Sequence, residues 1–192
     1  MNSSHKSRRH QLVLALGLAA FVLSWPLSSS GLSIKAPAWK QLVKQADWVV
    51  RVTVLKNQQT QLSNGLPVIQ THFKVLTTYK GTKTSQLVIQ LLGGTSKKYR
   101  IKLASLPRFA VNSQVILYLR KSKHTRFPIL VGLYHGVFDL RVKKGSIQVT
   151  HRGQKHDKQD LPTFEKRLQQ ELKKQSPTLV NRPTNNTAKS KQ

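Results

Sequence analysis

Few residues of this chain have side chains suited to catalysis or metal binding. The 192 residues include no cysteine, which excludes disulfides, thiolate metal sites and a cysteine nucleophile. The six carboxylates are Asp47, Asp139, Asp157, Asp160, Glu165 and Glu171. Only Asp47 and Asp139 fall in the region predicted below to form strands, and we expect structural roles for both. Asp47 would accept turn amides, and Asp139 would pair with Arg141 or with a lysine of a neighbouring strand.

Histidines raise the question of a metal site in the segment HRGQKHD at 151–157. His151, His156 and Asp157 could in principle share a divalent cation there. Lysine and arginine side chains stand among these potential ligands and would repel a metal ion. We therefore interpret the segment as a solvated basic loop and predict no metal site. His135 precedes a glycine and is assigned to a hairpin turn.

Motifs of nucleophilic and phosphate-transfer catalysis are missing from the sequence. No serine stands in a GxSxG elbow. Neither GTKTS at 81–85 nor GGTSKK at 93–98 contains the GxxxxGK[ST] loop of a nucleotide site, and both are typical of turns between strands. The sequence therefore predicts a protein that is not an enzyme, with no catalytic residue and no cofactor.

Positive charge is the main functional lead, because 33 Lys and Arg against six Asp and Glu give a net charge of +27. Cations gather in two segments, one flanked by Tyr118 and Phe127 and the other centred on Tyr99. The candidate anion-binding residues are Arg120, Lys121, Lys123 and Arg126 in the first segment and Lys97, Lys98, Arg100 and Lys102 in the second. Such clusters attract polyanions. The alternative is a proteome-wide drift toward lysine, in which case the charge says nothing about partners.

The first thirty residues have the layout of a secretory signal. Lys6, Arg8 and Arg9 precede an apolar stretch at 12–27, and small residues follow it. We predict a signal peptide at 1–30 and export to the periplasm or the medium, with an uncleaved N-terminal anchor as the alternative. No later segment could span a membrane. The expected partners are an anionic lipid, lipopolysaccharide, an acidic glycan or an exported protein, whereas nucleic acid is disfavoured by the location.

Hydrophobic periodicity divides the remaining chain into strands between two helices. Apolar residues at helical spacing from Trp39 to Ala46 predict a short helix over 36–46. Alternating patterns predict strands at 48–55, 68–79, 87–92, 99–103, 115–119, 129–133, 137–142 and 146–150. Asp160 can cap a second, amphipathic helix, in which Leu161, Phe164, Leu168 and Leu172 form a single apolar stripe. A basic tail at 175–192 lacks aromatic residues and is predicted to be disordered.

Short strands separated by turns, with no helix between them, leave no room for a βαβ unit. They predict a single mainly β domain over 36–174. We expect a small antiparallel OB-like barrel or sandwich, with a short N-terminal helix and a C-terminal amphipathic helix packed on it.

Five phrases resemble, in the same order, a broad family of uncharacterised exported bacterial proteins. They are QADWVVRVTV at 45–54, FKVLTTYKG at 73–81, VIQLLGG at 88–94, LPRFAVNSQVILYL at 106–119 and ILVGLYHGVFDLRV at 129–142. The last phrase reproduces the V-G-x-x-x-G-x-F pattern of that family with Val131, Gly132, Gly136 and Phe138. The resemblance implies export and a β-rich fold, and it implies no reaction.

A more remote likeness is to the netrin-like, OB-type module of metalloproteinase inhibitors, which resembles this chain in the order of its strands. The inhibitory device of those proteins is an N-terminal cysteine, and this chain has no cysteine. We therefore expect an exported, non-catalytic β-barrel module that binds an anionic envelope component or a protein partner. The alternative is a protease-inhibitor-like module that acts on an exported enzyme.

Overall fold

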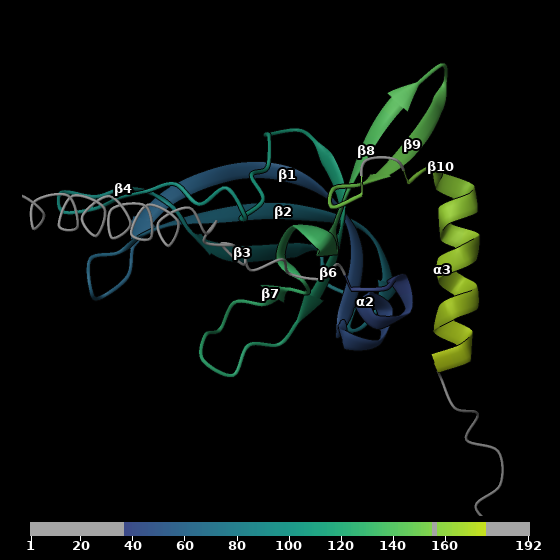
Figure 1. Cartoon of the computed structure of the whole chain (residues 1–192), viewed down its shortest axis with the longest axis horizontal. Helices are drawn as coiled ribbons and strands as arrows, with labels where there is room; N and C mark the ends of the chain where they lie inside the picture. The colour runs from purple at the N-terminus through teal and green to yellow at the C-terminus, as the bar shows by residue number, and fades with distance from the viewer. Residues whose placement is uncertain (1–36, 155–156, 176–192) are drawn as a thin grey trace, which may run out of the picture. The chain divides into compact units, whose positions relative to one another are not determined.

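The computed structural model describes residues 37–154 and 157–175, which belong to one compact unit, Ala36–Gln192. Strands dominate this part of the chain, with one large antiparallel sheet, a small two-stranded sheet and a helix at each end (Figure 1). The predicted mainly β architecture with a short N-terminal helix and a C-terminal helix is therefore confirmed. The predicted signal peptide at 1–30 and the predicted tail beyond Gln175 lie outside the described residues.

The large sheet has the strand order β10-β9-β8-β6-β1-β2-β3, and β7 pairs with β6 beside this path. Its strands are β1 (Trp48–Gln61), β2 (Pro67–Lys80), β3 (Gln86–Leu92), β6 (Gln114–Arg120), β7 (Ile129–Leu130), β8 (Val137–Lys143), β9 (Ser146–His151) and β10 (Lys158–Asp160). The small sheet pairs β4 (Gly94–Thr95) with β5 (Arg100–Ile101). Among residues 37–154 and 157–175, no pairing joins the edges β3 and β10 into a closed barrel.

β1 extends six residues beyond its predicted end at Leu55. Its apolar alternation stops at Val54; Leu55 is exposed, and the following stretch, Lys56–Gln61, is polar and mostly exposed. This stretch is nevertheless extended, because Lys56–Gln61 pairs residue by residue with Pro67–His72 of β2. Strand pairing thus overrides a weak local pattern.

The central strand β6 is apolar on both faces. On β6, Ile116 and Tyr118 enter a first apolar cluster, whereas Val115, Leu117 and Leu119 enter a second one. Burial on both faces explains why residues 115–119 form a continuous apolar run. The first cluster also takes buried side chains from α2 (Trp39–Gln45) and α3 (Leu161–Gln175), and the second takes side chains from β2 and β3.

α3 begins and packs as its sequence pattern predicts. Thr163 donates its backbone N–H to Asp160 Oδ2 at 3.2 Å. Hydrogen bonds from the Thr163 side chain and backbone lower the pKa of the Asp160 carboxyl. In the predicted stripe Leu161, Phe164 and Leu168 are buried and Leu172 is partly buried. The helix contacts β9, β10 and α2. These contacts place α3 over the first apolar cluster.

Several short elements differ from the predictions. Residues 133–136, which were divided between a predicted strand and a turn, form a 3-10 helix, η1 (Leu133–Gly136). The predicted strand at 99–103 shortens to β5. β4 and β10 contain too few residues to show a hydrophobic period, so the sequence does not predict them. None of the helices in the described part of the chain is long and apolar enough to cross a membrane.

Candidate anion-binding site

The two predicted basic clusters lie near opposite ends of β1. The cluster at 120–126 follows β6, where Leu119 pairs with Trp48 at the start of β1. The cluster at 97–102 belongs to the β4–β5 hairpin, whose Thr95 bonds Gln59 near the end of β1. Trp48 and Gln59 are eleven residues apart, a path of about 35 Å in an extended strand. The clusters are therefore separate surfaces.

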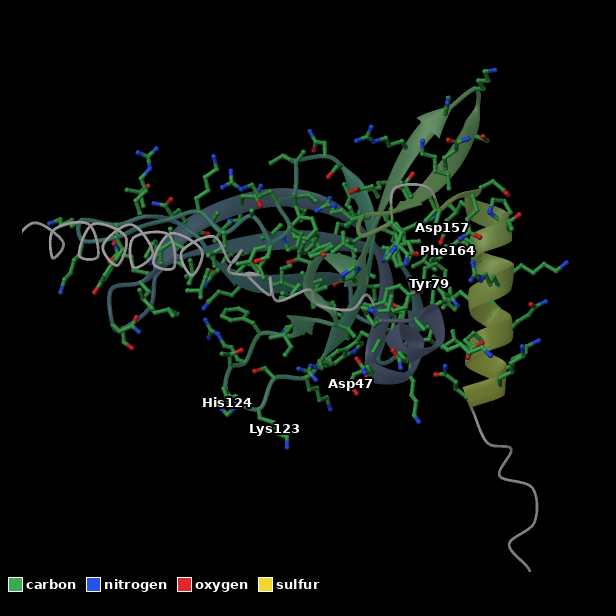
Figure 2. All side chains as sticks on the ribbon, viewed as in Figure 1. Asp47, Tyr79, Lys123, His124, Asp157 and Phe164 are labelled. Carbon is green, nitrogen blue, oxygen red and sulfur yellow. The ribbon has the colours of Figure 1, made fainter. Side chains whose placement is uncertain are left out.

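The segment 120–126 starts at the last residue of β6 and continues as an exposed loop, which is anchored at its start. Lys121 donates its backbone N–H to Asp47 Oδ2 at 2.7 Å, which confirms the prediction that Asp47 accepts an amide. Lys121 Nζ also lies 5.8 Å from the centroid of the Trp48 ring, within cation–π range. Lys123 and His124, labelled in Figure 2, are exposed farther along the loop.

The two aromatic residues that flank this loop offer little free ring surface. Tyr118 is fully buried, with its ring centroid 5.8 Å from that of Trp39 and 5.4 Å from that of Phe138. Phe127 is half-buried, and the Arg126 guanidinium carbon lies 4.9 Å from its ring centroid. Stacking of nucleic acid bases needs exposed aromatic faces, which these two residues do not provide.

A pocket of about 460 Å³ opens beside the second cluster. Its apolar lining consists of Ile69, Leu91, Leu92, Ile101, Leu103, Leu106, Pro107 and Phe109. Three cations, Arg100, Lys102 and Arg108, also line the pocket, and none of the six carboxylates of the chain does. The three cations are exposed, whereas Phe109 is buried, so the charge lies at the rim of an apolar hollow. This arrangement fits a small molecule with an apolar part and an anionic head.

The structure brings only part of the predicted cluster to this pocket. Arg100 and Lys102 line it, whereas Lys97 and Lys98 stand on the exposed turn between β4 and β5. Lys98 Nζ lies 5.7 Å from the centroid of the Tyr99 ring. Sequence reasoning missed Arg108, because it stands alone between Pro107 and Phe109 rather than in a run of cations. The apolar residues on both sides of Arg108 were the feature of the sequence that could have indicated its position beside an apolar pocket.

Gln59 holds the β4–β5 hairpin that forms one wall of the pocket. Gln59 Nε2 donates to the carbonyl oxygen of Thr95 at 2.7 Å, and the Thr95 N–H donates to Gln59 Oε1 at 3.2 Å. Gly94 lies directly against the same side chain, since a Cβ on Gly94 would be 2.5 Å from Gln59 Oε1. The polar end of β1 thus positions the pocket wall.

Two side chains that are distant in sequence, Asn57 of β1 and Arg152 just after β9, hold another wall, the segment 106–109. Asn57 Nδ2 donates to the carbonyl oxygen of Phe109 at 2.8 Å, and Asn57 Oδ1 accepts from Thr71 Oγ1 at 2.7 Å. Arg152 Nη1 donates to the carbonyl oxygen of Arg108 at 3.0 Å. The guanidinium carbon of Arg152 lies 5.2 Å from the centroid of the Phe109 ring. Both bonds fix backbone carbonyls and leave the Arg108 side chain outside the network.

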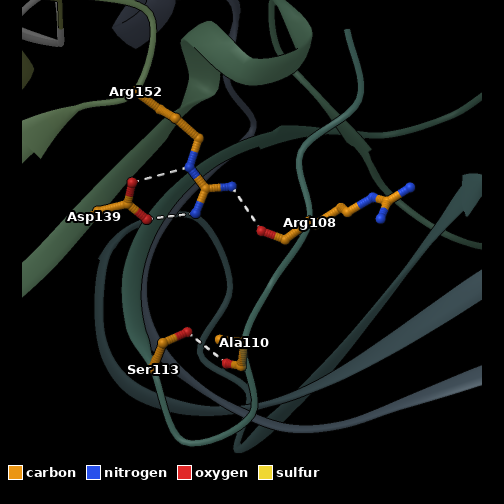
Figure 3. A network of polar contacts seen from close by, with 5 residues as sticks. All are labelled: Arg108, Ala110, Ser113, Asp139 and Arg152. Atoms are coloured by element: carbon orange, nitrogen blue, oxygen red, sulfur yellow. Dashed lines mark hydrogen bonds and ion pairs between the residues drawn. The ribbon is translucent and has the colours of Figure 1, made fainter. Parts of the chain in front are cut away.

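Asp139 pairs with Arg152, so the predicted pairing with Arg141 or with a lysine of a neighbouring strand is wrong. Arg152 Nε donates to Asp139 Oδ2 at 3.0 Å, and Arg152 Nη2 bonds Asp139 Oδ1 (Figure 3). The sheet register explains the choice, because Asp139 lies opposite Thr150, two residues before Arg152, while Arg141 is exposed. Figure 3 shows the Arg108 side chain pointing away from this ion pair.

The Arg152→Met variant is expected to lose about 1–2 kcal/mol of unfolding free energy, since it removes charge-assisted hydrogen bonds to Asp139 and Arg108 that are partly exposed. Amide hydrogen exchange over 102–110 should become faster, because the bond that restrains this segment is lost. Arg141→Met, which removes an exposed arginine from β8, is the control and should change both quantities little. Equal effects from the two variants would contradict the positioning role of Arg152.

The interpretation of 151–157 as a solvated loop is wrong for its first residue. The side chains of His151 and His135 are both buried. His151 Nε2 lies 2.7 Å from the backbone carbonyl oxygen of His135. Burial, with a smaller contribution from nearby His151, lowers the pKa of His135. His156 lies outside the described residues. Within 37–154 and 157–175, no three His, Cys, Asp or Glu side chains are grouped so that they could hold a metal ion.

Comparisons with known proteins add no assignment to this geometry. No family model, curated protein or solved structure matches the chain.

Proposed function

We propose that this protein is an exported, non-catalytic module that binds an anionic amphiphile of the cell envelope. The observation that carries the proposal is the pocket, which combines an apolar lining with a rim of three cations and no carboxylate. The acyl part of a ligand would contact Ile69, Leu91 and Phe109. A phosphate or carboxylate head would contact the rim. The predicted export supports this ligand class, because anionic lipids and lipopolysaccharide are abundant outside the cytoplasm.

Apolar contact and charge would contribute differently to binding. Burial of roughly 150 Å² of acyl surface is worth about 4 kcal/mol, at about 25 cal/mol per Å². The net charge of +27 and the exposed rim raise the local concentration of anions, but these contributions are screened by salt. We therefore expect affinity to fall as salt rises and to persist partly at high salt.

Neutralising the three cations of the rim is expected to weaken binding of dodecyl phosphate about tenfold, within a range of roughly 3-fold to 150-fold. Each exposed ion pair is worth roughly 0.2–1 kcal/mol, and about 1.4 kcal/mol corresponds to a tenfold change in affinity. The test variant carries Arg100→Gln, Lys102→Gln and Arg108→Gln. The control carries Arg120→Gln, Lys123→Gln and Arg126→Gln, which remove the same charges from the other cluster. Calorimetric titration of both variants at low salt measures the difference, and equal losses would contradict a pocket site.

Ligand analogues separate the two parts of the proposed chemistry. Inorganic phosphate should bind much more weakly than dodecyl phosphate, and dodecyltrimethylammonium should not bind. Vesicles with and without phosphatidylglycerol, and lipopolysaccharide, then distinguish the possible sources of the ligand. Leu103→Ser, at a pocket residue that is 44% exposed, should reduce affinity for dodecyl phosphate without changing that for inorganic phosphate. Equal binding of the two phosphates would contradict a role for the apolar lining.

Export and the OB-like or netrin-like form of the fold remain predictions. Cell fractionation tests the first, and the intact 192-residue chain in the soluble cytoplasm would contradict it. Amide hydrogen exchange of β3 tests the second, because a closed barrel requires a further strand pairing that would protect the N–H groups on the free side of β3. The resemblance to exported bacterial proteins supports the location and gives no ligand.

A further inference from the structure

β3 is an edge strand without the usual protection against strand pairing. It ends one side of the large sheet, and its seven residues, QLVIQLL, include no charge and no proline. The opposite edge, β10, has three residues, carries Lys158 and Asp160, and contacts α3. Natural sheets usually block a long edge with charges, proline, a bulge or a covering element. The outer side of β3 is therefore a candidate interaction surface.

Two hydrogen bonds fix which backbone groups of β3 face β2. The Gly93 N–H donates to the carbonyl oxygen of Pro67 at 3.0 Å, just beyond one end of β3. The Val75 N–H donates to the carbonyl oxygen of Ser85 at 2.9 Å, just before the other end. Hydrogen-bonded positions alternate along an antiparallel ladder. The odd-numbered residues of β3 therefore bond to β2.

The even-numbered residues of β3 direct their N–H and C=O groups away from the sheet. The Gln86 carbonyl accepts a bond from Thr84 Oγ1 at 2.8 Å. No residue in the described part of the chain donates to or accepts from the outward backbone groups of Val88, Gln90 and Leu92. These groups form a ladder that an added strand could complete.

Side chains beside this edge favour a partner with an apolar face. Leu87 and Leu91 are half-buried against the second apolar cluster, and Ile89 is fully buried in it. A strand added beside β3 would place every second side chain next to these leucines and cover their remaining surface. Its other side chains would lie beside Val88 and Gln90 on the opposite face of the sheet.

Cations flank both ends of β3. Lys83 precedes the strand, and Lys74 lies opposite Gln86 on β2. Beyond Leu92, the chain continues to the pocket rim with Arg100 and Lys102. The sequence contains no Asp or Glu between Asp47 and Asp139, so no nearby acid along the chain offsets these charges. An added segment with acidic side chains would be electrostatically complementary to these cations.

We propose that the outer side of β3 binds an extended, acidic segment of a protein partner, which adds to the sheet as a further strand. Main-chain hydrogen bonds to Val88, Gln90 and Leu92 provide the attachment, and the alternation of apolar and acidic side chains provides the selectivity. A second copy of this chain would bring the same cations to the same edge, and its net charge of +27 opposes self-association. The proposal does not rest on the amphiphile proposed for the pocket, although this surface shares Leu91 and Leu92 with the pocket lining.

Titration of the full chain with a labelled ten-residue peptide that alternates valine and glutamate tests the proposal. We expect binding by fluorescence anisotropy at low salt. Methylation of the backbone nitrogens of the peptide keeps its charge but removes strand pairing, and should weaken binding at least about tenfold. The same peptide with lysine in place of glutamate should not bind. Equal binding of the methylated peptide, or no binding of the acidic peptide, would overturn the proposal.

Val88→Pro tests the edge from the protein side. Proline removes an N–H that faces away from β2, so no bond of the ladder is lost. We expect about a tenfold loss of peptide affinity, while the matched control Val88→Ala stays within about twofold of the native chain. Dodecyl phosphate binding should be unchanged, because Val88 does not line the pocket. If Val88→Pro fails to fold, the methylated peptide on the native chain decides.

Analytical ultracentrifugation of the native chain tests whether a second copy of the chain, rather than an acidic peptide, occupies the edge of β3. We expect a monomer. A dimer that Val88→Pro converts to monomer would overturn the acidic-peptide proposal and identify a second copy as the occupant of the edge.

Discussion

The Phe164→Ala variant is expected to lose about 3–5 kcal/mol of unfolding free energy, the usual cost of removing a buried phenyl ring. Phe164 is fully buried in the first apolar cluster. Its ring centroid lies 5.0 Å from that of Trp39 and 5.3 Å from that of Phe138, both at steep interplanar angles. The ring therefore joins α3 to α2 and to the sheet, and alanine would leave a cavity between them.

Polar contacts of α3 cannot compensate for this loss. Tyr79 Oη donates to Glu165 Oε1 at 2.5 Å, and Arg51 Nη1 lies 3.9 Å from the same oxygen. Burial, together with the bond to Glu165, raises the pKa of Tyr79, so its hydroxyl stays protonated as a donor. The ion pair is partly exposed, and such pairs contribute about 0–1 kcal/mol.

Urea unfolding of Phe164→Ala beside Lys166→Ala measures the effect. Lys166 is an exposed residue of the same helix, and alanine there should change the unfolding free energy by less than about 0.5 kcal/mol. A loss below about 1 kcal/mol for Phe164→Ala would show that α3 does not stabilise the sheet through this ring.

Elements with a clear hydrophobic period are predictable from this sequence, because apolar side chains mark the buried face of a strand or helix and polar side chains mark the exposed face. The alternation in β2 and β8 identifies these strands within one or two residues of their ends, and the stripe that begins at Leu161 identifies the start of α3. The polar half of β1 is extended only because β2 lies beside it. A strand that is set by its partner has no signal of its own.

The pocket illustrates what sequence reasoning cannot reach. Its walls depend on Asn57 bonding Phe109, 52 residues away, and on Arg152 bonding Arg108, 44 residues away. Local charge density identified Arg100 and Lys102 but grouped them with Lys97 and Lys98, which stand outside the pocket lining. A run of cations in the sequence shows only where charge is dense along the chain. The shape of the pocket instead depends on side chains that bond backbone carbonyls far away in the sequence.

The two glycines of the V-G-x-x-x-G-x-F pattern are each required in this fold for a different physical reason. Gly132 has a positive φ of 64°, a left-handed conformation that costs other residues about 1–2 kcal/mol. Gly136 is needed for close packing, since a Cβ there would lie 2.3 Å from the carbonyl oxygen of Val131 and 3.2 Å from that of Tyr118. The Val131 N–H donates to the same Tyr118 carbonyl oxygen at 2.9 Å. The two residues whose carbonyl oxygens a Cβ on Gly136 would meet are therefore hydrogen-bonded to each other through their backbones.

Gly136→Ala should therefore destabilise the protein by about 3 kcal/mol, the upper end of the usual cost of overpacking, because backbone atoms cannot rotate out of the way as a side chain would. Gly145→Ala separates this steric effect from backbone strain. Gly145 has a positive φ of 78°, and a Cβ there would meet nothing within 4 Å. Its replacement should cost about 1–2 kcal/mol. Urea midpoints rank the two variants, and a smaller loss for Gly136→Ala than for Gly145→Ala would mean that the backbone around Val131 yields.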